Sequence, residues 1–183
     1  MKKLLLALVA LSLSQFAIAD WKLVPEQSSV TFLNIENGEI QESHQFKSLT
    51  GLISEDGYAK LLVDVRSVGQ IPIHNQEMKK LLAVITDNSI ATLTIKLNQA
   101  EINELSSLPV GGSVTEVVEI QLDLHGFSQT ILAKVQVIGS NKTELVIRSV
   151  KPVVIRGQDF KPGPDGSKLP PADVSLIVNL TFR

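Results

Sequence analysis

Apolar and polar residues alternate along most of the chain after residue 20, which is the pattern of strands with one buried face. The alternation is unbroken at 91–97 and 118–124, and it returns at 133–137 and 174–182. Less regular stretches of this kind cover 30–35, 51–54, 60–66 and 144–156, the last long enough for two strands or one bent strand. Turn-forming clusters separate the stretches, at 36–38, 55–57, 110–113, 125–126 and 139–141. The pattern predicts about eight antiparallel strands at hairpin spacing in one domain.

Helical periodicity is confined to short stretches. Asn75 can cap a helix whose apolar stripe is formed by Met78, Leu81, Leu82 and Ile85, so we expect a short helical cap over 75–82 at one end of the sheet. A weaker helical turn is expected at 100–105. Residues 161–171 are rich in proline and glycine, so they should form a stiff, exposed loop before the last strand.

The apolar faces of these strands must be buried, either between two packed sheets or inside a sheet closed into a barrel. An eight-stranded barrel has an interior that side chains fill or that holds one small ligand, and an aliphatic lining favours a chain-like apolar ligand. The candidate lining residues are Phe32, Leu93, Ile95, Ile120, Leu122, Val135, Val137, Ile147, Leu176 and Val178. An ordinary packed core predicts the same residues, so the pattern leaves open whether the interior is hollow or filled.

The N-terminus has a different character from the rest of the chain. Lys2 and Lys3 precede an apolar run over 4–13, and the small residues Ala17 and Ala19 stand before Asp20. This arrangement is typical of a bacterial secretory signal, and the run is shorter than the roughly 20 residues of a spanning helix. We therefore expect a signal peptide over 1–19, a single domain over 20–183 and a periplasmic protein.

Composition narrows the function classes. The 183 residues carry 17 Lys plus Arg against 19 Asp plus Glu, a net charge of −2 that becomes −4 once residues 1–19 are removed. This balance argues against nucleic-acid binding, which requires clustered basic charge. The chain has no cysteine, which excludes disulfides, cysteine nucleophiles and thiolate metal sites.

Few residues carry a signal of catalytic chemistry. His44, His74 and His125 stand in separate segments without metal-ligand spacing, and Glu101 and Glu104 fit solvated charges in a hydrophilic turn. No nucleophile motif such as Gly-x-Ser-x-Gly occurs. The sequence therefore predicts a protein that is not an enzyme, with no catalytic residue and no metal site.

Several segments, in order along the chain, resemble one known family. They are 21–32 (WKLVPEQSSVTF), 46–53 (FKSLTGLI), 63–68 (VDVRSV), 122–130 (LDLHGFSQT) and 154–160 (VIRGQDF). Together they resemble the YceI-like family, lipocalin-like proteins that bacteria export and that are associated with polyisoprenoid binding. The resemblance implies an all-β, eight-stranded antiparallel lipocalin-like barrel over 20–183 with a short helical cap. It also implies a periplasmic carrier for an amphiphile with a long apolar chain, a polyisoprenoid or quinone-like lipid, and no other cofactor.

The chain departs from the family pattern where an aromatic Asp-Phe-Phe-Asp and a Tyr-Pro usually follow the helix, because 81–89 reads LLAVITDNS. The identity and size of the ligand therefore stay open. A polar head group would need donors at the mouth of the barrel, for which the candidates are Arg66, Arg148 and Arg156, although surface charge explains them equally well. The alternative function is a protein-partner-binding β module with a filled core, using strand edges or the 161–171 loop. The oligomeric state is open, a homodimer included.

Overall fold

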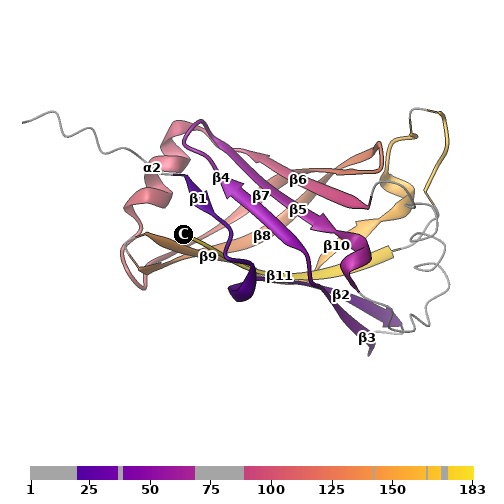
Figure 1. Ribbon diagram of the computed structural model, residues 1–183, viewed down its shortest axis with the longest axis horizontal. Helices are drawn as coiled ribbons and strands as arrows, with labels where there is room; N and C mark the ends of the chain where they lie inside the picture. The colour runs from indigo at the N-terminus through magenta and orange to yellow at the C-terminus, as the bar shows by residue number, and fades with distance from the viewer. Residues whose placement is uncertain (1–19, 37–38, 69–88, 142, 164, 170–172) are drawn as a thin grey trace, which may run out of the picture.

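The structure, a computed structural model, describes residues 20–36, 39–68, 89–141, 143–163, 165–169 and 173–183 (Figure 1). The signal peptide expected at 1–19 and the helical cap expected at 75–82 both lie outside these residues. Within them the chain forms an antiparallel β-sheet, one α-helix and short 3-10 turns.

Most of the described chain is strand. The strands are β1 (Trp21–Lys22), β2 (Ser29–Glu36), β3 (Glu39–Phe46), β4 (Leu49–Ile53), β5 (Tyr58–Asp64), β6 (Ile90–Lys96), β7 (Ser113–Leu124), β8 (Phe127–Asn141), β9 (Glu144–Ser149), β10 (Val153–Arg156) and β11 (Asp173–Phe182). The helical elements are η1 (Pro25–Gln27), η2 (Val65–Val68), α2 (Gln99–Ser107) and η3 (Gly157–Asp159). Each long alternating stretch of the sequence is a strand, so the all-β prediction is confirmed.

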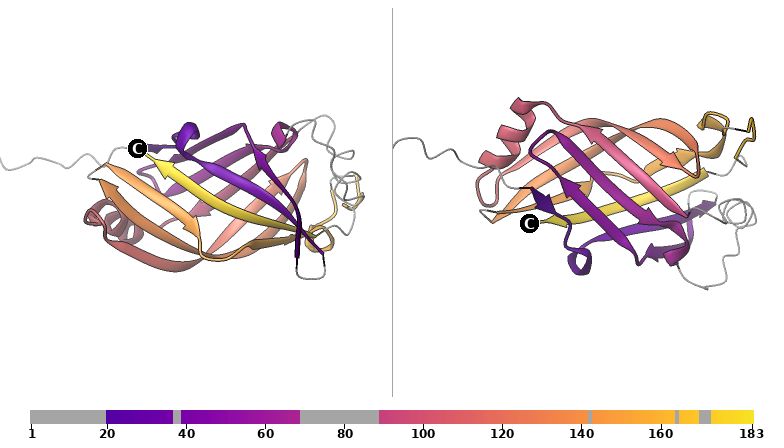
Figure 2. Two further views of the ribbon diagram at one scale, coloured as in Figure 1. Left: turned by 90° about the horizontal axis from the view of Figure 1, so that it is seen from below. Right: turned by 45° about the horizontal axis from the view of Figure 1, so that its top comes forward.

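The sheet curls into a half-barrel (Figures 1 and 2). Its strand order is β1-β4-β5-β6-β7-β8-β9-β11-β2-β3, and β10 pairs with β11 beside β9. At one end, β1 links β4 to β11: Trp21 pairs with Ile53, while the N–H of Lys22 and the N–H of Arg183 each bond the other residue's carbonyl at 2.8 Å. Through β1, backbone hydrogen bonds therefore connect β4 to the end of β11. The helix α2 covers this end of the sheet (Figure 1).

The predicted strand number is wrong, since the described residues form an 11-stranded sheet rather than one of eight. β1 is only two residues long, and β3 has no regular apolar alternation because its inward positions include His44. The stretch 144–156 divides into β9 and β10 around Pro152, whose nitrogen has no hydrogen to donate to a ladder.

The turn predicted at 139–141 is also wrong, because these residues continue β8 with an irregularity in its pairing to β9. A glycine is needed at position 139 because the segment around Pro109 approaches β8 closely there. A Cβ atom there would lie 2.6 Å from the carbonyl oxygen of Pro109, in the connection between α2 and β7.

The other turn predictions that fall on described residues agree with the structure. His125 and Gly126 join β7 to β8 with positive φ angles of 51° and 82°, as a two-residue hairpin turn requires. The helical turn expected at 100–105 is α2, whose N-terminus is capped by Asn98. The Asn98 side chain accepts hydrogen bonds from the N–H groups of Ala100 and Glu101, and the Glu101 carboxylate accepts one from the Asn98 N–H.

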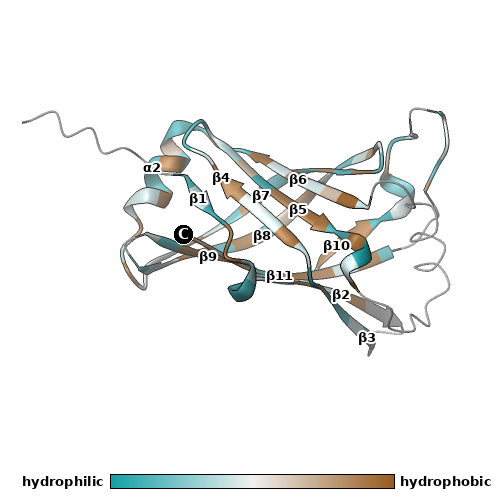
Figure 3. Cartoon of the chain, in the orientation of Figure 1, coloured by the Kyte–Doolittle hydropathy of each residue, from teal (hydrophilic) through white to brown (hydrophobic). Residues whose placement is uncertain are grey.

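Two apolar clusters fill the inner face of the sheet. The main cluster includes Phe32, Leu122, Val137 and Leu176, contributed by strands all around the curl. The second cluster consists of Ile120, Ile131, Ala133 and Val153, with Leu93, Ile95 and Val135 packed against it. Apolar and polar residues alternate along the strands in Figure 3, so each strand presents one face to these clusters.

The loop that follows η3 is largely exposed over its described residues, as expected, but it is fixed to the barrel. The N–H of Lys161 donates to the Ser128 carbonyl at 2.8 Å, and Leu169 is buried in the main cluster.

Candidate functional site

All of the lining residues expected from sequence lie on the inner face of the sheet. Phe32, Ile120, Leu122, Val137 and Leu176 are buried core residues. The others are half-buried and pack against one or both clusters, and they are Leu93, Ile95, Val135, Ile147 and Val178. The sheet thus curls around a mainly aliphatic interior that also contains a few buried polar side chains.

The three arginines expected near a head group stand on three different elements. Arg66 is exposed on η2, and Arg148 lies exposed on β9, where its Nε donates to Oδ1 of Asn179 at 3.1 Å. Arg156, at the end of β10, lines a pocket in the wall of the half-barrel.

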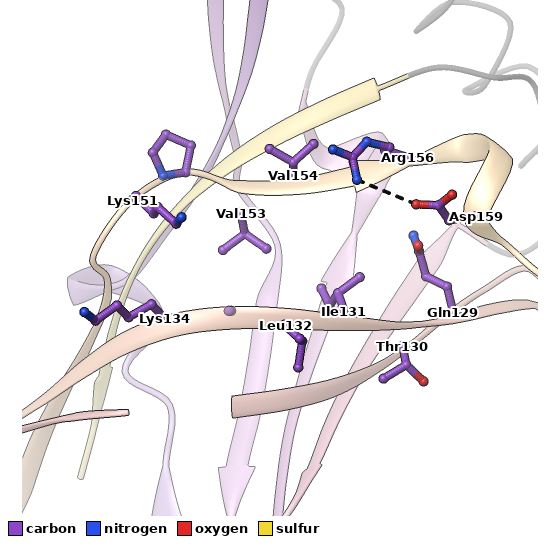
Figure 4. Close-up of a pocket in the computed structure, with 12 residues that line it drawn as sticks. Gln129, Thr130, Ile131, Leu132, Lys134, Lys151, Val153, Val154, Arg156 and Asp159 are labelled. Atoms are coloured by element: carbon purple, nitrogen blue, oxygen red, sulfur yellow. Dashed lines mark ion pairs between the residues drawn. The ribbon is translucent and has the colours of Figure 1, made fainter. Parts of the chain in front are cut away.

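That pocket has a volume of about 510 Å³ and lies between β8 and β10 (Figure 4). Its lining residues are Gln129, Thr130, Ile131, Leu132, Ala133, Lys134, Lys151, Pro152, Val153, Val154, Arg156 and Asp159. In Figure 4, Ile131 and Val153 point toward each other across the gap, whereas Leu132 and Val154 point away from it. We call this gap between the two strands the window.

The window is framed by backbone hydrogen bonds at both ends. The N–H of Val150 donates to the Lys134 carbonyl at 2.9 Å, and the N–H of Lys161 donates to the Ser128 carbonyl at 2.8 Å. Alternate residues of a strand direct their backbone groups to the same edge, so those of Thr130 and Leu132 face the window. In the described part of the chain β10 pairs with β11 and not with β8, so this stretch of β8 pairs with β7 on one edge and has no partner strand on the edge that faces β10.

Gln129 is the polar side chain on the inner edge of the window. The residue is only 4% exposed, and its Nε2 is the one buried side-chain nitrogen or oxygen without a hydrogen-bond partner among the described residues. In Figure 4 its amide end is directed from β8 toward Asp159. Sequence reasoning missed this residue, although its inward parity with Phe127 and Ile131 was a usable signal.

A second polar group on the inner face is satisfied. His44 is buried and stacks on Phe32 with the ring centroids 5.9 Å apart, and its Nε2 lies 3.3 Å from Oε2 of Glu42. Because this pair is internally hydrogen-bonded, it fits a structural role more simply than a reactive one.

His125 lies in the β7–β8 turn far along the chain from His44, while His74 is outside the described residues. Over the residues that the structure describes, no group of His, Asp and Glu side chains could hold a metal ion. No helix in that part of the chain is long and apolar enough to cross a membrane.

Comparison with known proteins identifies the fold. No family model matches the chain. Among solved structures, a polyisoprenoid-binding domain from Saccharophagus degradans implicated in plant cell wall breakdown is 25% identical with a TM-score of 0.70, over 89% of this chain and 97% of that one. BcnA of Burkholderia cenocepacia is 16% identical with a TM-score of 0.53, over 87% of this chain and 98% of that one.

One curated protein is similar over part of the chain. The phosphatidylinositol 4-phosphate 3-kinase C2 domain-containing subunit alpha of Pongo abelii is 26% identical over 106 residues, which is 53% of this chain. The chain spans only 6% of the length of that protein.

The half-barrel, its aliphatic inner face and the two structural neighbours define a lipocalin-like protein. More specifically, the fold is that of the YceI-like proteins, as the resemblance of the sequence implied.

Proposed function

We propose that this protein binds an amphiphile with a long apolar chain, a polyisoprenoid or quinone-like lipid, inside the half-barrel. We further propose that it acts as a periplasmic carrier once residues 1–19 are removed. The observation that carries the proposal is the largely aliphatic inner face, on which every expected lining residue lies. The likeness to a polyisoprenoid-binding domain over nearly the whole length of both chains supports it. Because that neighbour is a binding domain, the likeness is also consistent with a protein that is not an enzyme.

The energetics favour a chain ligand. Each isoprene unit transferred from water to the aliphatic interior contributes at most about 4 kcal/mol, taking about 0.8 kcal/mol per buried carbon group. Ordering a flexible chain and losing its translational freedom offset several kcal/mol of this gain. A few buried units are therefore enough for tight binding without any polar contact.

The direct test is native mass spectrometry of the purified mature protein, before and after lipid extraction, with added geranylgeraniol as the probe. A mass increase that disappears on extraction and returns with the probe is the expected result. Protein that is empty at every stage and takes up no prenyl lipid would rule out the carrier function.

A pair of matched variants tests whether the interior holds the ligand. Val135 is half-buried on the inner face of β8, whereas Val117 on β7 is exposed. Val135→Phe should occupy ligand space, so it should weaken prenyl binding and leave the melting temperature nearly unchanged, while Val117→Phe should leave binding unchanged. If the interior is instead packed solid, Val135→Phe should destabilise the fold by about 1–3 kcal/mol and no prenyl lipid should bind.

A further inference from the structure

The window contains hydrogen-bond donors that none of the described residues satisfies. The Nε2 of Gln129 is buried without a partner, although burial of an unpaired donor is costly and native proteins rarely tolerate it. The unpaired backbone edge at Thr130 and Leu132 adds N–H donors, together with carbonyl acceptors, beside it. A bound molecule that places an oxygen acceptor at this position would satisfy the Gln129 amide.

Basic side chains dominate the rim of the window. Lys134, Lys151 and Arg156 line it, against the single carboxylate of Asp159. Nη1 of Arg156 lies 3.8 Å from Oδ2 of Asp159, and its Nε lies 3.8 Å from Oδ2 of Asp173. The Arg156 side chain is 52% exposed. Long, solvated ion pairs of this kind are weak, so the guanidinium can exchange them for an oxyanion at little cost. The rim therefore favours an acidic group over a neutral one.

The inner side of the window is formed largely by the second apolar cluster. Ile131, Ala133 and Val153 line it, and all three belong to the second apolar cluster. On the outer side, Leu132 is 70% exposed and Val154 is also exposed, so an apolar lip borders the same gap. An apolar chain attached to a polar group in the window would lie against this cluster, which belongs to the aliphatic inner face.

From these observations we propose that the window holds the acidic head, a carboxylate or phosphate, of the amphiphile whose chain lies in the interior. The head oxygens accept hydrogen bonds from Nε2 of Gln129 and from the guanidinium of Arg156. This inference rests on the proposed function and assigns its ligand class, an acidic single-chain lipid.

The test compares three ligands that share one prenyl chain: geranylgeranyl monophosphate, geranylgeraniol and the corresponding hydrocarbon. Dissociation constants are measured by competition against a fluorescent fatty acid. The wild-type protein should bind the phosphate most tightly, then the alcohol, then the hydrocarbon. Inorganic phosphate alone should not bind detectably, because most of the affinity comes from the chain.

Two substitutions separate the contributions. Gln129→Met, which keeps the length of the side chain and removes its donor, should weaken binding of the phosphate and the alcohol about tenfold, the equivalent of about 1.4 kcal/mol, and leave the hydrocarbon unchanged. Arg156→Gln should weaken only the phosphate, by a similar factor. The matched controls on the outer face are Gln136→Met and Arg148→Gln, which should alter none of the three affinities.

A label can locate the head independently. Because the chain has no cysteine, Leu132→Cys carries a single environment-sensitive fluorophore at the lip of the window, and Val110→Cys carries it in the exposed α2–β7 connection. The phosphate ligand should shift the emission at position 132 and not at position 110.

The outcomes distinguish the two proposals. If all three ligands bind the wild type and Gln129→Met with equal affinity, the window does not hold the head, and the proposed function still stands. Tight binding of inorganic phosphate without a chain, or an equal loss in Arg148→Gln, would likewise overturn the assignment. If none of the prenyl ligands binds, it is the proposed function that fails.

Discussion

Replacing Gln129 by methionine is expected to stabilise the ligand-free protein, although it removes a polar side chain. The reason is that Nε2 of Gln129 is buried without a partner, so folding strips it of water and returns no hydrogen bond. An unsatisfied buried donor costs about 1–3 kcal/mol. Methionine is also unbranched and flexible, which lets it pack against Ile131 and the apolar inner face without forcing a new backbone position.

The expected gain is about 1–2 kcal/mol in the free energy of unfolding, because the new side chain does not match the shape of glutamine perfectly. For a domain of this size that gain corresponds to a rise of about 2–8 °C in melting temperature. Urea titration followed by circular dichroism gives the free energy, and a thermal scan gives the melting temperature. Both are done on delipidated protein, since a bound ligand would stabilise the wild type by mass action.

The matched control is Gln136→Met on the same strand. Gln136 is half-buried on the outer face, and its Nε2 donates to the Ser113 hydroxyl at 3.3 Å, so its loss should change stability by less than about 0.5 kcal/mol. If Gln129→Met is neutral or destabilising while the control behaves as stated, then the amide has a partner in the free protein. The assignment of the window as a head-group site would then lose its strongest support.

Three further predictions concern the stability of the fold. The Arg183 guanidinium donates a hydrogen bond to Glu144 and so holds the pKa of that carboxyl below its ordinary 4.5. The stabilisation of the fold by the ionised carboxylate is therefore present at neutral pH and is lost as the pH falls below 4.5. Acid titrations should show the stability difference between wild type and Glu144→Gln disappearing there. Gly57→Ala should destabilise the fold more than Gly111→Ala in urea titrations. Both glycines have positive φ, but only at Gly57 would a Cβ atom lie 2.4 Å from a carbonyl oxygen. Equal losses of stability would show that backbone strain alone matters. Asn98→Ala should cost about 1 kcal/mol in the same assay by removing the cap of α2, and no loss would mean that α2 does not depend on its cap.

Alternation predicted the strands well because most of them bury one face on an apolar cluster. It failed at β3, where the inward residue His44 is polar and stacks on Phe32 rather than joining an aliphatic surface. The turn prediction failed at Gly139, which lies within β8. The glycine is required because a distant segment, at Pro109, approaches the strand too closely for a Cβ atom. Contacts of this kind between remote segments leave no local pattern.

The candidate site was predicted only in part for a related reason. The ten candidate lining residues lie on the inner face because strand parity places them there, while their contact with a ligand stays a prediction. The window arises from the relation between two strands that are neighbours in space and do not pair, β8 and β10. Pro152 was a usable signal, because it lacks an N–H and interrupts the strand before β10. Parity also placed Gln129 inside, but only the structure shows that its amide nitrogen has no partner.

Two costly features coincide at the window. β8 and β10 do not pair through their backbones, and one of the buried side chains on that stretch of β8 is a glutamine with an unpaired donor. Either feature alone could be corrected by small changes, since an apolar residue at position 129 would remove the unpaired donor. Local departures from favourable packing that lie together are expected at functional sites, where stability is exchanged for binding. The basic rim gives the same place a charge preference, so a single acidic head group would account for the missing pairing, the unpaired amide and the clustered cations together.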